Sequence, residues 1–79
     1  MNLLNIFENS NDEDIRKFFL HKNVIISYKN GEVLGGLITN FIGASIKDDP
    51  TRTIVGFVFH NGNEIVISSE YIKELLIIN

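Results

Sequence analysis

The spacing of apolar side chains divides the chain into a helical N-terminal segment and a β-rich remainder. Apolar residues recur at helical intervals in residues 2–8 and again in residues 11–21. Ser10 is followed three residues later by Glu13, which is typical of a capping box with Ser10 as the N-cap. The pattern therefore predicts a short turn or helix over 2–8 and a helix over 11–21.

From residue 24 onward the pattern is that of strands separated by tight turns. The Asn-Gly pairs at 30–31 and 61–62 stand between β-rich runs, and such pairs are typical of hairpins in which both central residues take a positive φ. Gly35-Gly36 lies inside a run and indicates a bend or bulge. We predict a loop over 43–51, strands over 24–28, 32–42, 53–60, 64–68 and 73–78, and one helical turn over 68–72.

Several of these strands are apolar on both faces. In the strand over 53–60, Phe57 and Phe59 point to one face while Ile54 and Val58 point to the other. Strands of this kind need cover on both faces, and one helix covers only part of a sheet. A subunit interface is therefore expected, with the last strand as the edge available to a neighbour. The alternative is that the N-terminal helical segment covers everything.

Length and composition place the chain among small globular domains. Seventy-nine residues correspond to a single domain over 1–79, with an N-terminal helical segment over 1–22 and a β-rich body over 24–78. The 44% of hydrophobic and 22% of charged residues are too apolar a mixture for disorder, and the lack of cysteine excludes disulfides and thiolate zinc sites. A domain this small buries a modest share of its surface, so it needs either a very efficient core or a partner subunit.

Charge and the N-terminal sequence restrict location and partners. A net charge of −3 disfavours a protein that holds nucleic acid by bulk positive charge. No apolar run is long enough to span a membrane, and the N-terminal sequence has no basic region or cleavage site of a signal peptide, so we expect a cytoplasmic protein. The 13 Ile and 10 Asn residues have AT-rich codons, which suggests an AT-rich bacterium or its phage as the source.

A helix followed by five short strands with two tight hairpins resembles the Sm-like fold, which includes bacterial Hfq. The turn Lys29-Asn30-Gly31 is similar to the turn after the first Sm strand, and the stretch from Gly35 to Phe41 is similar to the glycine and phenylalanine pattern of the second. Residues 64–73 are similar to the strand, helical turn and last strand that complete this fold. The resemblance covers roughly residues 11–78. It implies a five-stranded, strongly bent small β-barrel, mainly β with an N-terminal helix.

The resemblance also implies assembly and ligand binding. In Sm-like rings the fourth strand of one subunit pairs with the last strand of the next, which makes Val66, Leu76 and Ile78 the expected interface residues. In the family an Asp follows this Phe and an Asn comes shortly after it. Here Phe41 is followed by Ile42-Gly43-Ala44-Ser45, so neither residue is present and the family's uridine contacts are not carried over.

Candidate ligand-binding residues come from the residue types that suit a nucleotide. Tyr28 offers a stacking surface, Lys47 and Arg52 flank the 43–52 loop and would form a positive girdle in a ring, and Ser68 and Ser69 stand where Sm-like proteins contact their ligands. Asn40, next to Phe41, completes this set. The alternatives are that the loop is locally neutral, that Ser69 only initiates the helical turn, and that Tyr28 is part of the core.

The sequence contains few candidate residues for catalysis or metal binding. His21 and His60 are the only histidines and are expected to be structural, and Asp48-Asp49 lacks a third acid and suits a solvated loop. We expect no enzyme, no cofactor and no metal. The leading hypothesis is a homo-oligomeric Sm-like binding module for RNA or a small nucleotide. The alternative is a small phage-type inhibitor or adaptor that binds a host defence or regulatory protein.

Overall fold

The computed structural model describes residues 2–43 and 51–78, which form two short helices, five strands and one 3-10 turn. The prediction of a mainly β fold with an N-terminal helix is confirmed, whereas most of the predicted 43–51 loop, with Lys47, lies outside the described residues. The elements are α1 (Leu4–Asn9), α2 (Asp12–Phe19), β1 (Asn23–Tyr28), β2 (Val33–Gly43), β3 (Ile54–His60), β4 (Glu64–Ser68), η1 (Ser69–Tyr71) and β5 (Ile72–Ile77).

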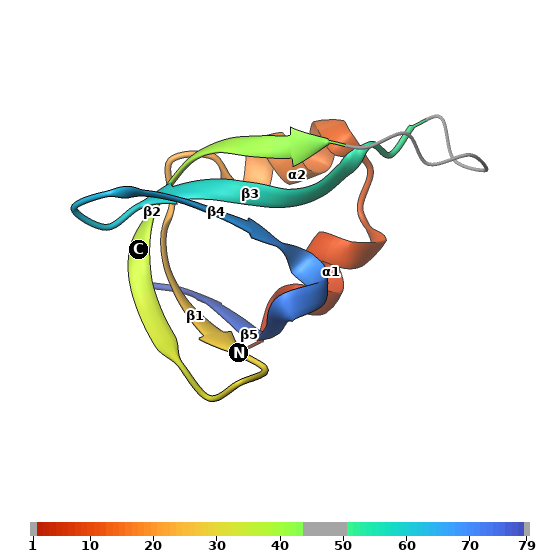
Figure 1. Cartoon of the computed structure of the whole chain (residues 1–79). Helices are drawn as coiled ribbons and strands as arrows, with labels where there is room; N and C mark the ends of the chain where they lie inside the picture. Colours follow the sequence, from red (N-terminus) through yellow and green to blue (C-terminus); the bar gives the residue numbers. More distant parts are fainter. Residues whose placement is uncertain (1, 44–50, 79) are drawn as a thin grey trace.

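All five strands belong to one antiparallel sheet with the order β4-β3-β2-β1-β5. The long strand β2 curves through both halves of the molecule and brings the two ends of the sheet toward each other, with η1 joining β4 to β5 (Figure 1). Within the described residues β4 and β5 do not pair, so the sheet is strongly bent but open, and a closed barrel is not confirmed.

The start of α2 differs from the predicted capping box. Asn11 is the N-cap, and its Oδ1 accepts a hydrogen bond from the Asp14 N–H (2.9 Å). Ser10 instead ends α1, where its hydroxyl donates to the Ile6 carbonyl (2.6 Å). Ser and Asn are both good N-caps, and the chain uses the second because α1 extends to Asn9 and occupies Ser10.

The two hairpin turns also differ from the prediction of two positive φ angles each. Gly31 (φ 96°) and Gly62 (φ 73°) are left-handed, but the asparagines before them are not. In the first turn the Gly31 N–H donates to the Tyr28 carbonyl and the Tyr28 N–H to the Glu32 carbonyl. Three residues, 29–31, therefore lie between the bonded pair Tyr28 and Glu32, in the common loop type with a single left-handed residue at its end.

The glycine pair inside β2 is not a bulge. Pairing between β1 and β2 runs without a break through Gly35 and Gly36, whereas the register of β2 against β3 shifts between Ile38 and Asn40. Gly36 is needed for a close approach, because a Cβ there would lie 2.6 Å from Cδ2 of Phe59.

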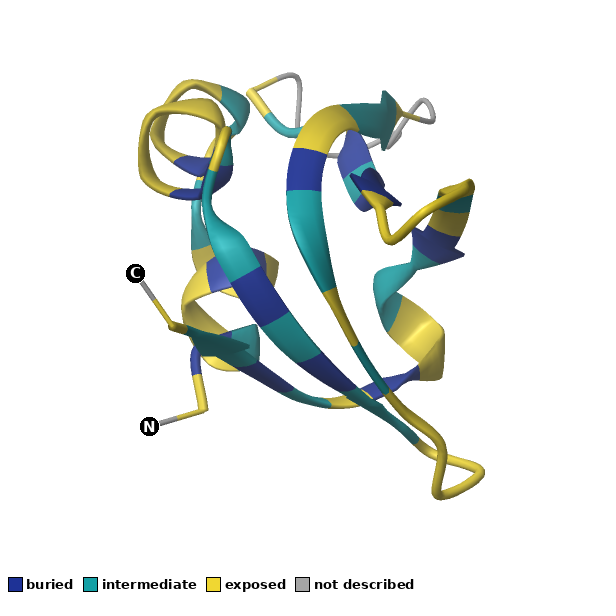
Figure 2. Cartoon of the chain, turned by 90° about the vertical axis from the view of Figure 1, so that its left-hand side faces the viewer, coloured by how far each residue is buried: buried dark blue, intermediate teal, exposed yellow. Residues whose placement is uncertain are grey.

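The core lies between the concave side of the sheet and the two helices (Figure 2). Phe7 of α1 is fully buried and meets Phe19 of α2 and Phe57 of β3 edge-to-face, with ring centroids 5.5 and 5.6 Å apart. β3 is buried on both faces, as its sequence predicts. The buried apolar residues are Leu3, Phe7, Ile15, Phe19, Val24, Ile26, Ile38, Ile54, Phe57, Val58, Phe59, Ile67, Ile72 and Leu75.

Apolar side chains also remain on the surface. Val33, Val66 and Ile78 are each about 60% exposed, as is Tyr71. Over the described ranges, none of the helices has the length and apolar character required to cross a membrane.

Candidate binding groove

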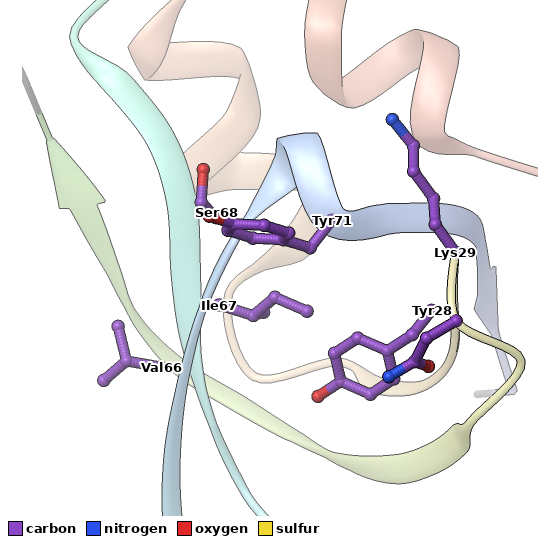
Figure 3. Close-up of a pocket in the computed structure, with 7 residues that line it drawn as sticks. Tyr28, Lys29, Val66, Ile67, Ser68 and Tyr71 are labelled. Atoms are coloured by element: carbon purple, nitrogen blue, oxygen red, sulfur yellow. The ribbon is translucent and has the colours of Figure 1, made fainter.

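A groove with a volume of about 420 Å³ lies between the outer edge of β4 and the turn that joins β1 to β2. Its lining combines two aromatic rings, one cation, one amide, one hydroxyl and two aliphatic side chains. The residues are Tyr28, Lys29, Asn30, Val66, Ile67, Ser68 and Tyr71 (Figure 3).

Backbone hydrogen bonds hold the two walls of the groove together. The Lys29 N–H donates to the Tyr71 carbonyl (3.0 Å), which ties the β1–β2 turn to η1. Asn30 Oδ1 accepts from the Glu32 N–H (2.9 Å) and fixes the turn from inside. The groove is therefore formed by segments about 40 residues apart in sequence that the bent sheet brings together.

The two tyrosines provide the aromatic surface. Figure 3 shows the rings of Tyr28 and Tyr71 on opposite sides of Ile67, which points between them from β4. Tyr71 is 60% exposed and thus presents most of its ring to solvent, whereas Tyr28 is half-buried. Burial, and then the charge of Glu32, raise the pKa of Tyr28 above its ordinary value, so its phenol stays neutral near pH 7.

Two polar side chains of the groove, Ser68 and Lys29, are available for hydrogen bonding or ion pairing with a ligand. Within residues 2–43 and 51–78, the Ser68 hydroxyl makes only a long contact, 3.5 Å from its Oγ to the Val55 carbonyl. Lys29 is the one charged residue of the lining, and it forms no ion pair within the described residues. An aromatic ring, a hydroxyl with only one long contact and a single cation suit a flat, polar-edged ligand that carries negative charge.

Among the described residues, no strand pairs with the outer edge of β4, which forms one wall of the groove. The Asn61 N–H donates to the Asn63 carbonyl (3.0 Å) and closes the β3–β4 hairpin. In an antiparallel pair, successive residues alternate between bonding to the partner strand and pointing away from it. Starting from the Asn61–Asn63 bond, every second residue of β4 therefore directs its backbone N–H and C=O away from β3. These residues are Glu64, Val66 and Ser68.

The opposite edge of the sheet, that of β5, is covered by the chain's own N-terminus. The side chain of Asn2 accepts from the Leu75 N–H (3.0 Å) through Oδ1 and donates to the Lys73 carbonyl (3.2 Å) through Nδ2. The Leu3 N–H adds a bond to the Leu75 carbonyl (2.7 Å). The Asn2 amide thus makes the pair of bonds that a neighbouring strand would make.

The predicted ligand residues are distributed over several places. Tyr28 and Ser68 lie in the groove, and Ser69 is half-buried in η1 beside it. Asn40 is exposed on β2, where its Oδ1 accepts from the Phe41 N–H (2.8 Å), so it lies outside the groove. The sequence pattern missed Tyr71, Lys29 and Asn30, although Lys29 and Asn30 belong to a turn that it identified.

Arg52, the remaining candidate, binds the fold itself. Its Nη1 donates to the Phe7 carbonyl (2.6 Å) and the Ser10 carbonyl (2.8 Å), and the guanidinium lies 5.6 Å from the centre of the Phe7 ring. These bonds satisfy carbonyls at the end of α1 that have no helical partner. We therefore leave Arg52 out of the candidate site.

The expected interface residues occupy both edges of the sheet. Val66 is exposed on β4 and Ile78 is exposed just beyond β5, whereas Leu76 is half-buried. Across residues 2–43 and 51–78, no three His, Cys, Asp or Glu side chains gather as metal ligands would.

Comparisons of the chain with protein-family models, with curated protein sequences and with solved structures give no match. The interpretation of the groove therefore depends on its own chemistry.

Proposed function

We propose that this protein is a non-enzymatic binding module of the Sm-like type, which takes a nucleotide or an unpaired nucleotide of RNA in the groove beside β4. The observation that carries the proposal is the meeting of Tyr28, Tyr71, Lys29 and Ser68 in one groove. The strand order and the N-terminal helix are compatible with an Sm-like architecture.

Each wall of the groove has a part in this proposal. The open face of Tyr71 stacks on the base, and stacking of this kind contributes roughly 1–3 kcal/mol per base. Lys29 pairs with a phosphate, and Ser68 offers a donor or acceptor to a base or ribose edge. With one lysine in the groove and a net charge of −3, the ligand is a single nucleotide or a short single strand and not a long duplex.

Intrinsic fluorescence gives a direct test, because the chain has no Trp and both of its tyrosines line the groove. Titration with mononucleotides and with short A-rich and U-rich oligonucleotides should quench the tyrosine emission in a saturable manner. Isothermal titration then gives the affinity. Tyr71→Ala should lower it roughly tenfold or more, as expected for the loss of one stacked base, and Lys29→Gln should reduce its dependence on salt.

Matched controls separate the groove from general effects. Phe18→Ala removes an exposed aromatic residue from α2, and Lys17→Gln removes an exposed cation from the same helix, so neither should alter binding. Unquenched fluorescence with every nucleotide tested, or equal losses in the control variants, would contradict the proposal.

A second candidate is the phage-type inhibitor or adaptor, and the observation that favours it is the unpaired edge of β4. An extended segment of a host protein can add to such an edge as an extra strand, with its side chains in the adjoining groove. A stoichiometric protein partner together with no nucleotide binding would favour this candidate over the first.

A further inference from the structure

We infer that the free edge of β4 is a self-association surface, on which a second copy of this chain adds its own β4 in antiparallel orientation about a two-fold axis at Val66. This inference concerns an interaction surface and does not depend on the nucleotide proposal. It rests on the two sheet edges, on the sequence of β4 and on the position of Lys29.

The first argument is that β4 offers the open edge. Among the described residues β4 pairs only with β3, and the outward backbone groups of Glu64, Val66 and Ser68 have no strand beside them. Val66 is 59% exposed, so an apolar side chain stands at the middle of this edge. Unpaired edges of this kind are templates for another strand.

The second argument is that the β5 edge is covered. A head-to-tail assembly, in which β4 of one copy joins β5 of the next, needs the outward groups of Lys73 and Leu75. Asn2 and Leu3 already bond to the Lys73 carbonyl and to both the N–H and the carbonyl of Leu75. With one edge open and the other occupied, pairing of like edges is the assembly that leaves the Asn2 contacts intact, and it closes at a dimer.

The third argument is that β4 is complementary to itself. When two β4 strands pair, the residues whose backbone N–H and C=O point outward must lie opposite each other. Centring the pair on Val66 brings all three such residues of each strand into the pairing. In this register Val66 faces Val66 of the second copy, and Glu64 faces Ser68 of the second copy. A register that brings the two Glu64 residues together would make fewer bonds and would oppose like charges.

Charge favours the same register. Ser68 and Lys29 line the same groove, and Lys29 is its one charged residue. Glu64 of the second copy, opposite Ser68, lies at this end of the groove and brings a carboxylate toward the ammonium. The occupant that fits the edge by hydrogen bonding also fits it by charge.

An added strand lies across the groove, so a second copy and a nucleotide compete for it. Saturating nucleotide should therefore shift a dimer toward monomer if both proposals hold. If the nucleotide proposal fails, the dimer remains to be tested by itself.

Single cysteine variants test the register, because the chain has no cysteine of its own. In the inferred dimer the two Val66 Cα atoms are about 5.5 Å apart, which suits a disulfide, whereas the two Glu64 Cα atoms are roughly 14 Å apart. Under mild oxidation Val66→Cys should form covalent dimers roughly tenfold faster than Glu64→Cys or Ser68→Cys alone. A mixture of the last two variants should form a mixed dimer.

Mass in solution tests the assembly. Light scattering over a range of concentrations should show the wild type rising from monomer to dimer, and Val66→Lys should stay monomeric. Val66→Pro should do the same, since it removes an outward N–H and leaves the bonds to β3 in place; circular dichroism verifies that both variants fold. A wild type that is monomeric at every concentration, masses beyond the dimer, or equal crosslinking of all three cysteine variants would overturn the inference.

Discussion

At the scale of single residues, Asp12 joins the start of α2 to the start of β3. Its carboxylate accepts from the Thr53 N–H (2.8 Å), from the Thr53 hydroxyl (2.6 Å) and from the Ile54 N–H (2.9 Å). We expect Asp12→Asn to lower the free energy of unfolding by about 1–2 kcal/mol, since the amide keeps one acceptor and loses the charge. Urea denaturation measures this. Asp14→Asn, in the same helical turn, should have a much smaller effect.

Asp12 should also make stability depend on pH in the acid range. Burial raises its pKa, but the hydrogen bonds from Thr53 and Ile54 and the charge of Arg16 outweigh burial and hold the pKa below its usual value. The stabilisation is therefore complete above the unfolded pKa of 3.8 and is lost as the pH falls through the lower folded pKa. Between pH 5 and pH 2 the wild type should lose more stability than Asp12→Asn. Parallel losses in the two proteins would contradict this.

Arg52 is the residue for which a structural role and a binding role predict different outcomes. Arg52→Met keeps much of the side-chain volume but leaves the Phe7 and Ser10 carbonyls without their donor, so we expect a loss of roughly 1–3 kcal/mol in stability. Thermal denaturation measures it, and nucleotide affinity of the folded variant should be unchanged. A stable variant that no longer binds nucleotide would assign Arg52 to the ligand instead.

At the scale of elements, the two neighbouring glycines of β2 differ in the space that surrounds them. A Cβ on Gly36 would meet the His60 carbonyl oxygen at 2.7 Å and Cδ2 of Phe59 at 2.6 Å, whereas a Cβ on Gly35 would find ordinary contacts of 3.5 Å or more. Gly36→Ala should therefore destabilise the protein by about 1–3 kcal/mol, and Gly35→Ala should be neutral or slightly stabilising. Chemical denaturation of the two variants makes the comparison, and equal effects would contradict it.

The elements themselves could be predicted from the sequence because each has a strong local signal. The predicted strand over 64–68 agrees with the structure at both ends. The apolar residues at both alternating sets of positions in 53–60 predicted that β3 is buried on both faces. Local signals were insufficient where two neighbours offered the same chemistry. Ser10 and Asn11 are both capping residues, and the choice depends on where α1 ends.

At the scale of the whole molecule, the groove could be predicted only in part. Tyr28 was identified by residue type and Ser68 by its place in the Sm-like resemblance. Tyr71 has no periodic pattern around it, since it ends a 3-10 turn of three residues. Its position beside Lys29 depends on the bending of the sheet, which brings η1 against the β1–β2 turn. The cover of β5 by Asn2 joins residues more than 70 positions apart, and no local pattern predicts such a contact.

Asn2 therefore controls which edges of the molecule are open to a neighbour. Asn2→Ala removes the bonds to the Leu75 N–H and the Lys73 carbonyl, so the Leu75 amide should exchange with solvent faster in a hydrogen-exchange experiment. With the Leu75 N–H and the Lys73 carbonyl open as well as the β4 edge, unlike edges can pair and the assembly no longer closes at a dimer. Light scattering should then show masses beyond the dimer, while Asn5→Ala, an exposed asparagine of α1, should behave as the wild type. Faster exchange at Leu75 with no mass above the dimer would mean that Asn2 covers the edge without limiting assembly.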